Sequence, residues 1–395
     1  MNTATQKFIS ENADRDVRQL ALQAAKYSDV DMPFALKQIE GKQKIQLKIP
    51  TFYNCSELQY PVGLSLEQAS SEVTANYKSI LCQGNLFVDL TGGFGVDTYF
   101  ISSRFKQAYY VERNQELCTL AVNNFRALNQ LQIKVICSDA EQFLDNCEYT
   151  SDWIYIDPSR RDKSGKKTVL LADCEPNITY LYPKLLQKSK RIMIKLSPMI
   201  DISSVLNDLP HISQIHVLAV ENECKELLFM MDASNSKHPI VYTRNFRKGN
   251  NTQAFDFELG EELTATAPFA EKVENYLYEP NAAIMKSAAF KLIAKRYSLS
   301  KLHRNTHLYT SNVVAPHFPG RVFEIISLWE NKKEWKQRVE SIQKANISTR
   351  NYPIGAEELR KKLKLNDGGD TFLFACTLNN GNKTIIECKK YEPEI

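Results

Sequence analysis

The sequence predicts an α/β protein whose central domain is built on a mostly parallel β-sheet. Between residues 84 and 231, short apolar runs alternate with helical segments, the pattern of strands joined by helical crossovers. The first apolar run, residues 86–90, leads into three glycines within four positions. The last two runs are separated by only six residues, too few for a helical crossover, so we expect them to form an antiparallel hairpin.

Length and composition limit the class of protein. A chain of 395 residues exceeds one typical domain of about 100 to 200 residues, so several domains are expected. The apolar content of 43% is ordinary for a globular protein, and no apolar run approaches the roughly 18 residues of a membrane span. We therefore expect a cytoplasmic protein without membrane contact. Nine scattered cysteines without a CxxC pair predict reduced thiols and neither a disulfide framework nor a zinc site.

Residues 1–80 are expected to form a helical N-terminal region. Asp31, two positions before a proline, is typical of a helix start, and Ser65 with Gln68 fits a capping box for a helix that reaches the end of this region. Between them, residues 44–50 alternate like a short strand.

Three polar residues close this region, namely Thr74, Tyr77 and Lys78. They precede the first strand closely enough to cover a site at its end. The favoured interpretation is that they cap and solvate a helix.

The central domain is expected to span residues 81–232. Strands are predicted at residues 86–90, 108–112, 133–137, 153–156, 191–196, 215–220 and 227–231, with helices near 96–104, 115–129 and 176–189. The turn after the first strand contains Gly92, Gly93 and Gly95. Glycine lets a ligand approach the backbone of such a turn and the following helix N-terminus. Tight packing of strand against helix is an equally weighted alternative.

Acids lie at the ends of three successive strands, at Asp89, Glu112 and Asp139. Each could simply cap a helix. Glu112 lies 23 positions after Asp89, near the roughly 20-residue spacing of a ribose-binding acid in a dinucleotide fold. Three such acids at one sheet edge favour a nucleotide-like ligand.

A second motif, Asp157-Pro158-Ser159-Arg160-Arg161, follows the fourth strand. Together with Lys163, Lys166 and Lys167, its arginines place five cations within eight positions, where a substrate phosphate would be met. An arginine can also stack on a base. A plain turn followed by a flexible charged loop is the alternative.

The remaining chain is expected to contain a linker with an extra hairpin at 233–280, a basic piece at 281–322 and an α+β domain at 323–395. From residue 281 onward there are 20 lysines and arginines against 11 acids, an excess of nine positive charges. Residues 281–323 hold seven cations and no acid, which favours a phosphate-rich partner over a solvated helix face.

Within this part we predict a helix near 281–297, a strand near 321–329, helices near 332–344 and 355–364, and a hairpin of residues 371–378 and 383–389. His303 and His307, four positions apart, could share a helix face as metal ligands. No third ligand is apparent nearby, so we expect no metal site.

The alternating pattern, the glycine turn, the three acids and the final hairpin resemble the class I S-adenosylmethionine (SAM) dependent methyltransferases. The resemblance implies a Rossmann-like seven-stranded sheet with an antiparallel last hairpin. It implies that SAM contacts the turn residues Asp89, Thr91, Gly92, Gly93 and Gly95, that Glu112 binds the ribose hydroxyls and that Asp139 contacts the adenine amine.

In methyltransferases of exocyclic base amines, the motif that matches Asp157-Pro158 continues with a second proline and an aromatic residue. Here Ser159 and Arg160 stand in those places. The resemblance implies that Asp157, Pro158, Ser159 and Arg160 form the catalytic loop. It implies substrate contacts for Arg160, Arg161, Lys163 and Lys195. No cysteine occupies the places used for carbon-5 methylation of pyrimidines, which favours direct transfer to nitrogen or oxygen.

The order of segments resembles a bacterial methyltransferase family with a ferredoxin-like piece and a C-terminal THUMP-like domain. THUMP modules bind RNA, usually tRNA, and the SAM domain also looks like trimethylguanosine synthase. We therefore expect a SAM-dependent methyltransferase of tRNA or rRNA that acts on a base nitrogen, with guanine N2 as one candidate, and that holds RNA through residues 281–323 and the C-terminal domain. The alternatives are methylation of a protein or small molecule, and an RNA-binding protein with a vestigial SAM site.

Overall fold

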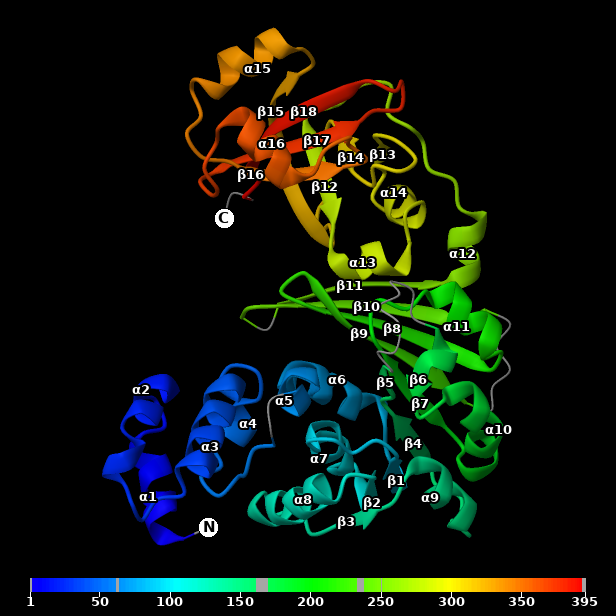
Figure 1. The fold of residues 1–395 in the computed structure, drawn as a ribbon. Helices are drawn as coiled ribbons and strands as arrows, with labels where there is room; N and C mark the ends of the chain where they lie inside the picture. Colours follow the sequence, from blue (N-terminus) through cyan, green and yellow to red (C-terminus); the bar gives the residue numbers. More distant parts are fainter. Residues whose placement is uncertain (1, 62–63, 161–169, 233–237, 250, 393–395) are drawn as a thin grey trace. The chain divides into compact units, whose positions relative to one another are not determined.

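The computed structural model describes residues 2–61, 64–160, 170–232, 238–249 and 251–392 (Figure 1). The chain divides into two compact units, Met1–Ser213 with Leu228–Ser236 and Gln214–Leu227 with Lys237–Ile395. The division falls within two strands of one sheet. No helix among the described residues is both long and apolar enough to cross a membrane.

Unit 1 begins with the predicted helical region. Its helices are α1 (Thr3–Glu11), α2 (Val17–Leu22), η1 (Ala24–Lys26), α3 (Met32–Ile45), α4 (Pro50–Tyr53), α5 (Leu64–Gln68) and α6 (Glu72–Leu81). The Asp31 carboxylate accepts a hydrogen bond from the Phe34 backbone N–H, which confirms the predicted start of α3.

The strand predicted at residues 44–50 is wrong, because these residues form the end of α3, a turn and the start of α4. Ile45 and Ile49 are fully buried, whereas Leu47 between them is 94% exposed. Burial therefore follows the four-residue spacing of a helical turn and not the two-residue alternation of a strand.

The single helix predicted from Ser65 to the end of the region is also wrong. It is interrupted between α5 and α6, where the Ser71 hydroxyl accepts a hydrogen bond from the Thr74 N–H and caps α6. The interruption leaves Ser70 outside both helices, and Ser70 is only 4% exposed.

The helical region packs against the glycine turn. Ile49 and Phe52 share a buried cluster with Phe94 and Val96, which lie in the turn and at the start of the following helix. The aromatic rings of Phe52 and Phe94 meet edge to face at 5.3 Å. The N-terminal region thus stabilises the backbone that forms the predicted ligand site.

The central sheet contains all seven predicted strands. They are β1 (Gly84–Asp89), β2 (Phe105–Glu112), β3 (Ile133–Cys137), β4 (Trp153–Ile156), β7 (Ile192–Leu196), β8 (Ile212–Val220) and β9 (Glu223–Met231). The connecting helices are α7 (Val96–Ser102), α8 (Gln115–Ala127), α9 (Ala140–Asn146), α10 (Ile178–Lys188) and α11 (Ile202–Asp208). Every residue of β4 and β7 is buried, as expected for a parallel sheet covered on both faces.

The strand order is β11-β10-β8-β9-β7-β4-β1-β2-β3 (Figure 1). β1, β2, β3, β4 and β7 pair in parallel. Only Glu221 and Asn222 separate β8 from β9, and both have positive φ, which is the geometry of a tight hairpin. This is the class I methyltransferase fold.

The hairpin expected in 233–280 extends this sheet. β10 (Ile240–Arg247) pairs in parallel with β8 and antiparallel with β11 (Asn251–Glu258), and α12 (Leu259–Thr264) follows. The sheet therefore has nine strands rather than the seven that the resemblance implied.

The rest of unit 2 is an α+β structure on a second sheet, of order β13-β14-β12-β15-β18-β17-β16. Its strands are β12 (Tyr276–Pro280), β13 (Ser300–Lys301), β14 (Tyr309–Ser311), β15 (Gly320–Trp329), β16 (Asn346–Arg350), β17 (Thr371–Thr377) and β18 (Lys383–Lys390). Its helices are α13 (Ala282–Ser287), α14 (Leu292–Arg296), α15 (Lys332–Val339) and α16 (Ala356–Leu363). β15, α16 and the β17–β18 hairpin confirm the corresponding predictions.

The single helix predicted near 281–297 is wrong. Ala288 has a left-handed backbone with φ +59°, and this residue separates α13 from α14. His303 and His307 lie in the turn between β13 and β14, so they do not share a helix face.

Candidate functional site

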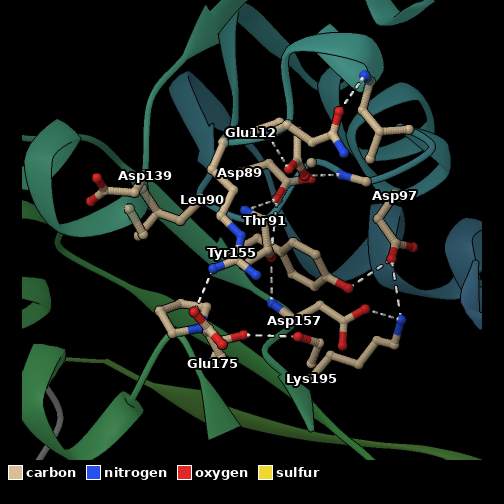
Figure 2. A pocket seen from close by; sticks show the side chains of 18 of the residues that line it. Asp89, Leu90, Thr91, Asp97, Glu112, Asp139, Tyr155, Asp157, Glu175 and Lys195 are labelled. Atoms are coloured by element: carbon tan, nitrogen blue, oxygen red, sulfur yellow. Dashed lines mark hydrogen bonds and ion pairs between the residues drawn. The ribbon is translucent and has the colours of Figure 1, made fainter. Parts of the chain in front are cut away.

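A cleft of about 1070 Å³ opens in unit 1 at the carboxyl ends of the parallel strands (Figure 2). It gathers most of the residues predicted for the site. Those that line it are Asp89, Thr91, Gly92, Gly93, Gly95, Glu112, Asp139, Asp157, Ser159 and Lys195. Pro158 is buried and is not among the lining residues.

The glycine turn combines packing with an open approach to the backbone. A Cβ on Gly92 would lie 2.2 Å from the Tyr110 ring, so this glycine is required for packing. Gly93 has φ +54°, and the nearest atom to its virtual Cβ is the Thr91 carbonyl oxygen at 3.8 Å. Tight packing therefore explains Gly92, whereas Gly93 leaves the backbone open to a ligand.

The second-strand acid is fixed to this turn. One carboxylate oxygen of Glu112 accepts the Gly93 N–H at 3.0 Å, and the other accepts the Asn114 N–H at 2.9 Å. Asp139 is exposed at the cleft and caps α9 by accepting the Gln142 N–H at 2.8 Å. Acids from two strands therefore face the same cleft as the glycine turn.

Asp89 is buried beneath the turn. Its carboxylate accepts hydrogen bonds from the Thr98 hydroxyl at 2.6 Å and the Thr91 N–H at 2.9 Å. Burial raises the pKa of Asp89 to about 7, against the opposing effect of these two hydrogen bonds. Asp89 therefore shapes the turn, and only 1% of the residue is exposed.

Asp157 lies beside the turn, at the end of β4. Its backbone N–H donates to the Thr91 hydroxyl at 2.7 Å, and its Oδ2 lies 2.5 Å from the Lys195 ammonium (Figure 2). Burial raises the pKa of the Asp157 carboxyl, while Lys195 opposes that rise. Within the described residues, Lys195 holds Oδ2 of Asp157 and Oδ1 accepts no hydrogen bond, and Asp157 is among the residues that line the cleft.

A buried polar cluster lies behind Asp157. The Lys195 ammonium donates to the Ser70 hydroxyl at 3.1 Å, and this hydroxyl donates to Asp97 Oδ2 at 2.8 Å. The Lys78 ammonium lies 2.8 Å from Asp97 Oδ1 and donates to the same Ser70 hydroxyl. The Tyr155 hydroxyl also donates to Asp97, at 2.7 Å (Figure 2).

The expectation that Lys78 is solvated is wrong, since its side chain is fully buried against Asp97. Burial alone would raise the pKa of Asp97, but the Lys78 and Lys195 ammonium groups outweigh it and hold this pKa well below the usual range.

Comparison with known proteins places the chain in a family. Family models match a ferredoxin-like domain at residues 276–319 and a THUMP domain-like segment at 320–390. A solved structure from Porphyromonas gingivalis W83, assigned as a methyltransferase, is 33% identical, and the match covers 98% of each chain with a TM-score of 0.89. The chain belongs to this methyltransferase family.

Other similarities are weaker. An rRNA methylase from Streptococcus thermophilus is 15% identical over 40% of this chain and 94% of its own, with a TM-score of 0.31. TrmK from M. capricolum, solved with S-adenosyl-homocysteine, is 16% identical over 40% of this chain and 67% of its own, with a TM-score of 0.30. No curated protein matches the sequence.

In this methyltransferase family member, part of the predicted loop after Asp157 lies outside the residues that the structure describes. The side chain of Arg160 and all of Arg161, Lys163, Lys166 and Lys167 lie outside the described structure. The backbone of Ser159 and Arg160 pairs with Cys174 and Glu175 in the short β5–β6 ladder. The main chain after Asp157 thus runs along the edge of the cleft.

Several residues of the site were not predicted from the sequence. Ser70, Asp97 and Tyr155 line the cleft, as do Glu175 and Tyr180. Asp97 falls within the helix predicted near 96–104, and Ser70 falls within the helix predicted to begin at Ser65. Only the interruption between α5 and α6 would have pointed to Ser70, and the sequence does not mark it strongly.

The basic segment 281–323 is partly neutralised within unit 2. Arg321 forms an ion pair with Glu279, which also pairs with Arg350 at 2.8 Å, and Arg296 pairs with Glu261 at 3.0 Å. Acids from outside the segment therefore compensate some of its charge, while Lys295 and Arg304 are exposed.

Proposed function

We propose that this chain is a SAM-dependent methyltransferase that methylates a base nitrogen of RNA. One observation carries the proposal: an open glycine turn, the strand-end acids and Asp157, of which Lys195 holds one carboxylate oxygen, line the same cleft. The family match supports methyl transfer as the reaction class. The THUMP domain-like segment supports RNA as the substrate class.

The cleft fits the cofactor. Gly93 has open space beside a backbone with positive φ, and Glu112 presents a carboxylate that is already oriented by two backbone N–H groups. Asp139 is exposed at the same edge. These residues would hold the amino-acid, ribose and adenine parts respectively, in the order that the resemblance implies. When bound, SAM supplies an electrophilic methyl group.

Asp157 would orient the acceptor nitrogen. Its Oδ1 can accept a hydrogen from an exocyclic amine and thereby direct the nitrogen lone pair, while Lys195 and Thr91 fix the side chain and backbone. The nitrogen loses one proton when the new N–C bond forms, and a carboxylate with a raised pKa is suited to accept it. Catalysis would consist mainly of positioning.

The proposal extends to the target base. Guanine N2 is favoured by the resemblance to trimethylguanosine synthase, and Arg160 replaces the aromatic residue that usually stacks the base. The guanidinium could stack on the base in its place. RNA would contact Lys295, Arg304 and the C-terminal domain through phosphate charges.

The decisive experiment combines methyl transfer with cofactor binding. Wild-type protein should transfer labelled methyl groups from SAM to RNA of a strain that lacks this gene, and mass spectrometry of the nucleosides would identify the base. Asp157→Ala and Asp157→Asn should abolish transfer, while calorimetry still detects SAM binding. Retained turnover in both variants would overturn the role of Asp157.

Treatment of the acceptor with RNase separates the alternatives. Transfer that survives RNase would show that the acceptor is a protein or a small molecule. Micromolar SAM binding together with any labelled cellular RNA would exclude a vestigial cofactor site. Failure to bind SAM would overturn the proposal as a whole.

A further inference from the structure

The buried cluster behind Asp157 contains two ammonium groups and two carboxylates. Lys78 comes from α6, Asp97 from α7, Asp157 from the end of β4 and Lys195 from β7. The formal charges balance, and the shortest ion pair of each carboxylate is with a different lysine, Asp97 with Lys78 and Asp157 with Lys195. Lys78 does not line the cleft, so it cannot act by touching the substrate.

Lys195 lies between the two carboxylates. Its ammonium is 2.5 Å from Asp157 Oδ2 and 3.8 Å from Asp97 Oδ2. The Ser70 hydroxyl accepts hydrogen bonds from both lysines and donates to Asp97, which links the two pairs. A small movement of a flexible lysine side chain could therefore transfer Lys195 from one carboxylate to the other.

We propose that Lys78 is a positioning residue for methyl transfer: by holding Asp97, it leaves the Lys195 ammonium available to fix Asp157. The inference rests on the proposed function of Asp157. It assigns a role in the reaction to a fully buried lysine that lies outside the cleft.

Removing Lys78 would leave two carboxylates for one ammonium. An unpaired buried carboxylate is strongly unfavourable, so Lys195 is expected to divide its time between Asp97 and Asp157. Asp157 then loses both its orientation and part of its compensating charge. The other charged groups that act on Asp157 in the described structure are the acids Asp89 from β1 and Asp97 from α7, and Tyr155 from β4 donates to Asp97. None of them supplies a positive charge in exchange.

Lys78→Met tests the proposal through the ionisation of Asp157, which needs neither SAM nor RNA. In protein with 13C-labelled aspartate carboxyls, the signal of Asp157, assigned by its loss in Asp157→Asn, should titrate at higher pH in Lys78→Met than in wild type. Lys78→Met/Asp97→Asn restores one carboxylate for one ammonium, so its titration should return toward the wild-type position. An unchanged titration in Lys78→Met would overturn the inference.

Two further variants keep the test valid if Lys78→Met folds poorly. Asp97→Asn alone leaves two ammonium groups for Asp157, so the Asp157 signal should titrate at lower pH than in wild type. Lys190→Met removes an exposed lysine that pairs with Asp152 at 2.9 Å, and it should leave the Asp157 titration unchanged. If Asp97→Asn leaves the titration unchanged, or Lys190→Met moves it as far as Lys78→Met, the inference is wrong.

Methylation kinetics give the functional readout. In Lys78→Met, the acid limb of the kcat profile should move to higher pH, with kcat at pH 6 about 10-fold lower and KM for RNA changed less than about 2-fold. Adding Asp97→Asn to Lys78→Met is expected to return kcat at pH 6 toward the wild-type value. If wild type does not methylate RNA but the carboxyl titrations shift as described, the proposed function fails while the charge arrangement stands.

Discussion

At the residue scale, Gly92 and Gly93 of the turn serve different purposes. A side chain at Gly92 would overlap the Tyr110 ring, whereas Gly93 has positive φ and open space beside it. A methyl group added at each position therefore has a different consequence for stability and for cofactor binding.

We predict that Gly92→Ala destabilises the protein by about 1 to 3 kcal/mol or more, because the new Cβ overlaps a buried ring. Gly93→Ala should cost only about 1 kcal/mol through its left-handed backbone. It should nevertheless weaken SAM binding about 10-fold or more, a loss of about 1.4 kcal/mol. Denaturant unfolding and calorimetry measure the two effects, and equal stability losses would contradict the division of roles.

Asp89 makes stability depend on pH. Its pKa of about 7 in the folded state lies above the value of 3.8 for an unperturbed aspartate, so the folded protein binds the extra proton between these values. The stabilising contribution is fully present below about pH 4 and is lost as pH rises toward 7.

Asp89→Asn should therefore flatten the dependence of unfolding free energy on pH between about 4 and 7, as measured by urea unfolding at several pH values. Asp152→Asn is the contrasting variant. The bond to Lys190 lowers the Asp152 pKa, so its stabilising contribution is present above about pH 4 and is lost only as pH falls below that value. If the slope of unfolding free energy against pH in Asp89→Asn equals that of wild type, the raised pKa of Asp89 is contradicted.

At the element scale, the helical region depends on a few apolar side chains that face the glycine turn. Ile45, the last residue of α3, and Ile49, which precedes α4, are buried, and Leu47 between them is exposed. The strand interpretation of the same residues would have placed all three on one face.

Substitution distinguishes the two interpretations. Ile49→Ala should destabilise the protein by about 2 to 5 kcal/mol, since it leaves a cavity in a buried cluster. Leu47→Ala is the matched control, with an expected change within about 0.5 kcal/mol. Comparable losses at both positions, measured by chemical unfolding, would favour the strand.

At the scale of the whole molecule, our proposal places methyl transfer in unit 1 and RNA binding by exposed cations in unit 2. The cleft lies entirely within unit 1, whereas the exposed cations Lys295 and Arg304 lie in unit 2. Charge reversal in unit 2 should therefore act on RNA binding and leave cofactor binding unchanged.

Lys295→Glu/Arg304→Glu should weaken RNA binding and reduce the slope of log K against log salt by about one for each lost phosphate contact. Lys37→Glu/Lys106→Glu changes two exposed lysines of unit 1 by the same charge and serves as the control. Filter binding at several salt concentrations measures both. Equal effects of the two double variants would point to net charge rather than a defined surface.

The sequence by itself determined the class I fold and the strand-end positions Asp89, Glu112, Asp139 and Asp157. Strand periodicity and glycine turns are local signals, and the carboxyl ends of parallel strands must meet at one edge. The sequence predicted the hairpin in 233–280 but not that β10 and β11 extend the sheet from seven strands to nine, because edge pairing of β10 with β8 depends on distant surfaces.

The tertiary structure decided how the charged residues pair. Lys78, Asp97 and Lys195 are distant in sequence, and Ser70 joins them only because a helix break places it in their midst. Whether a lysine is solvated or buried depends on what packs over it, and no local pattern encodes that. The same reason explains why the sequence did not show that Asp89, at the edge of the cleft, is buried and hydrogen-bonded to the turn.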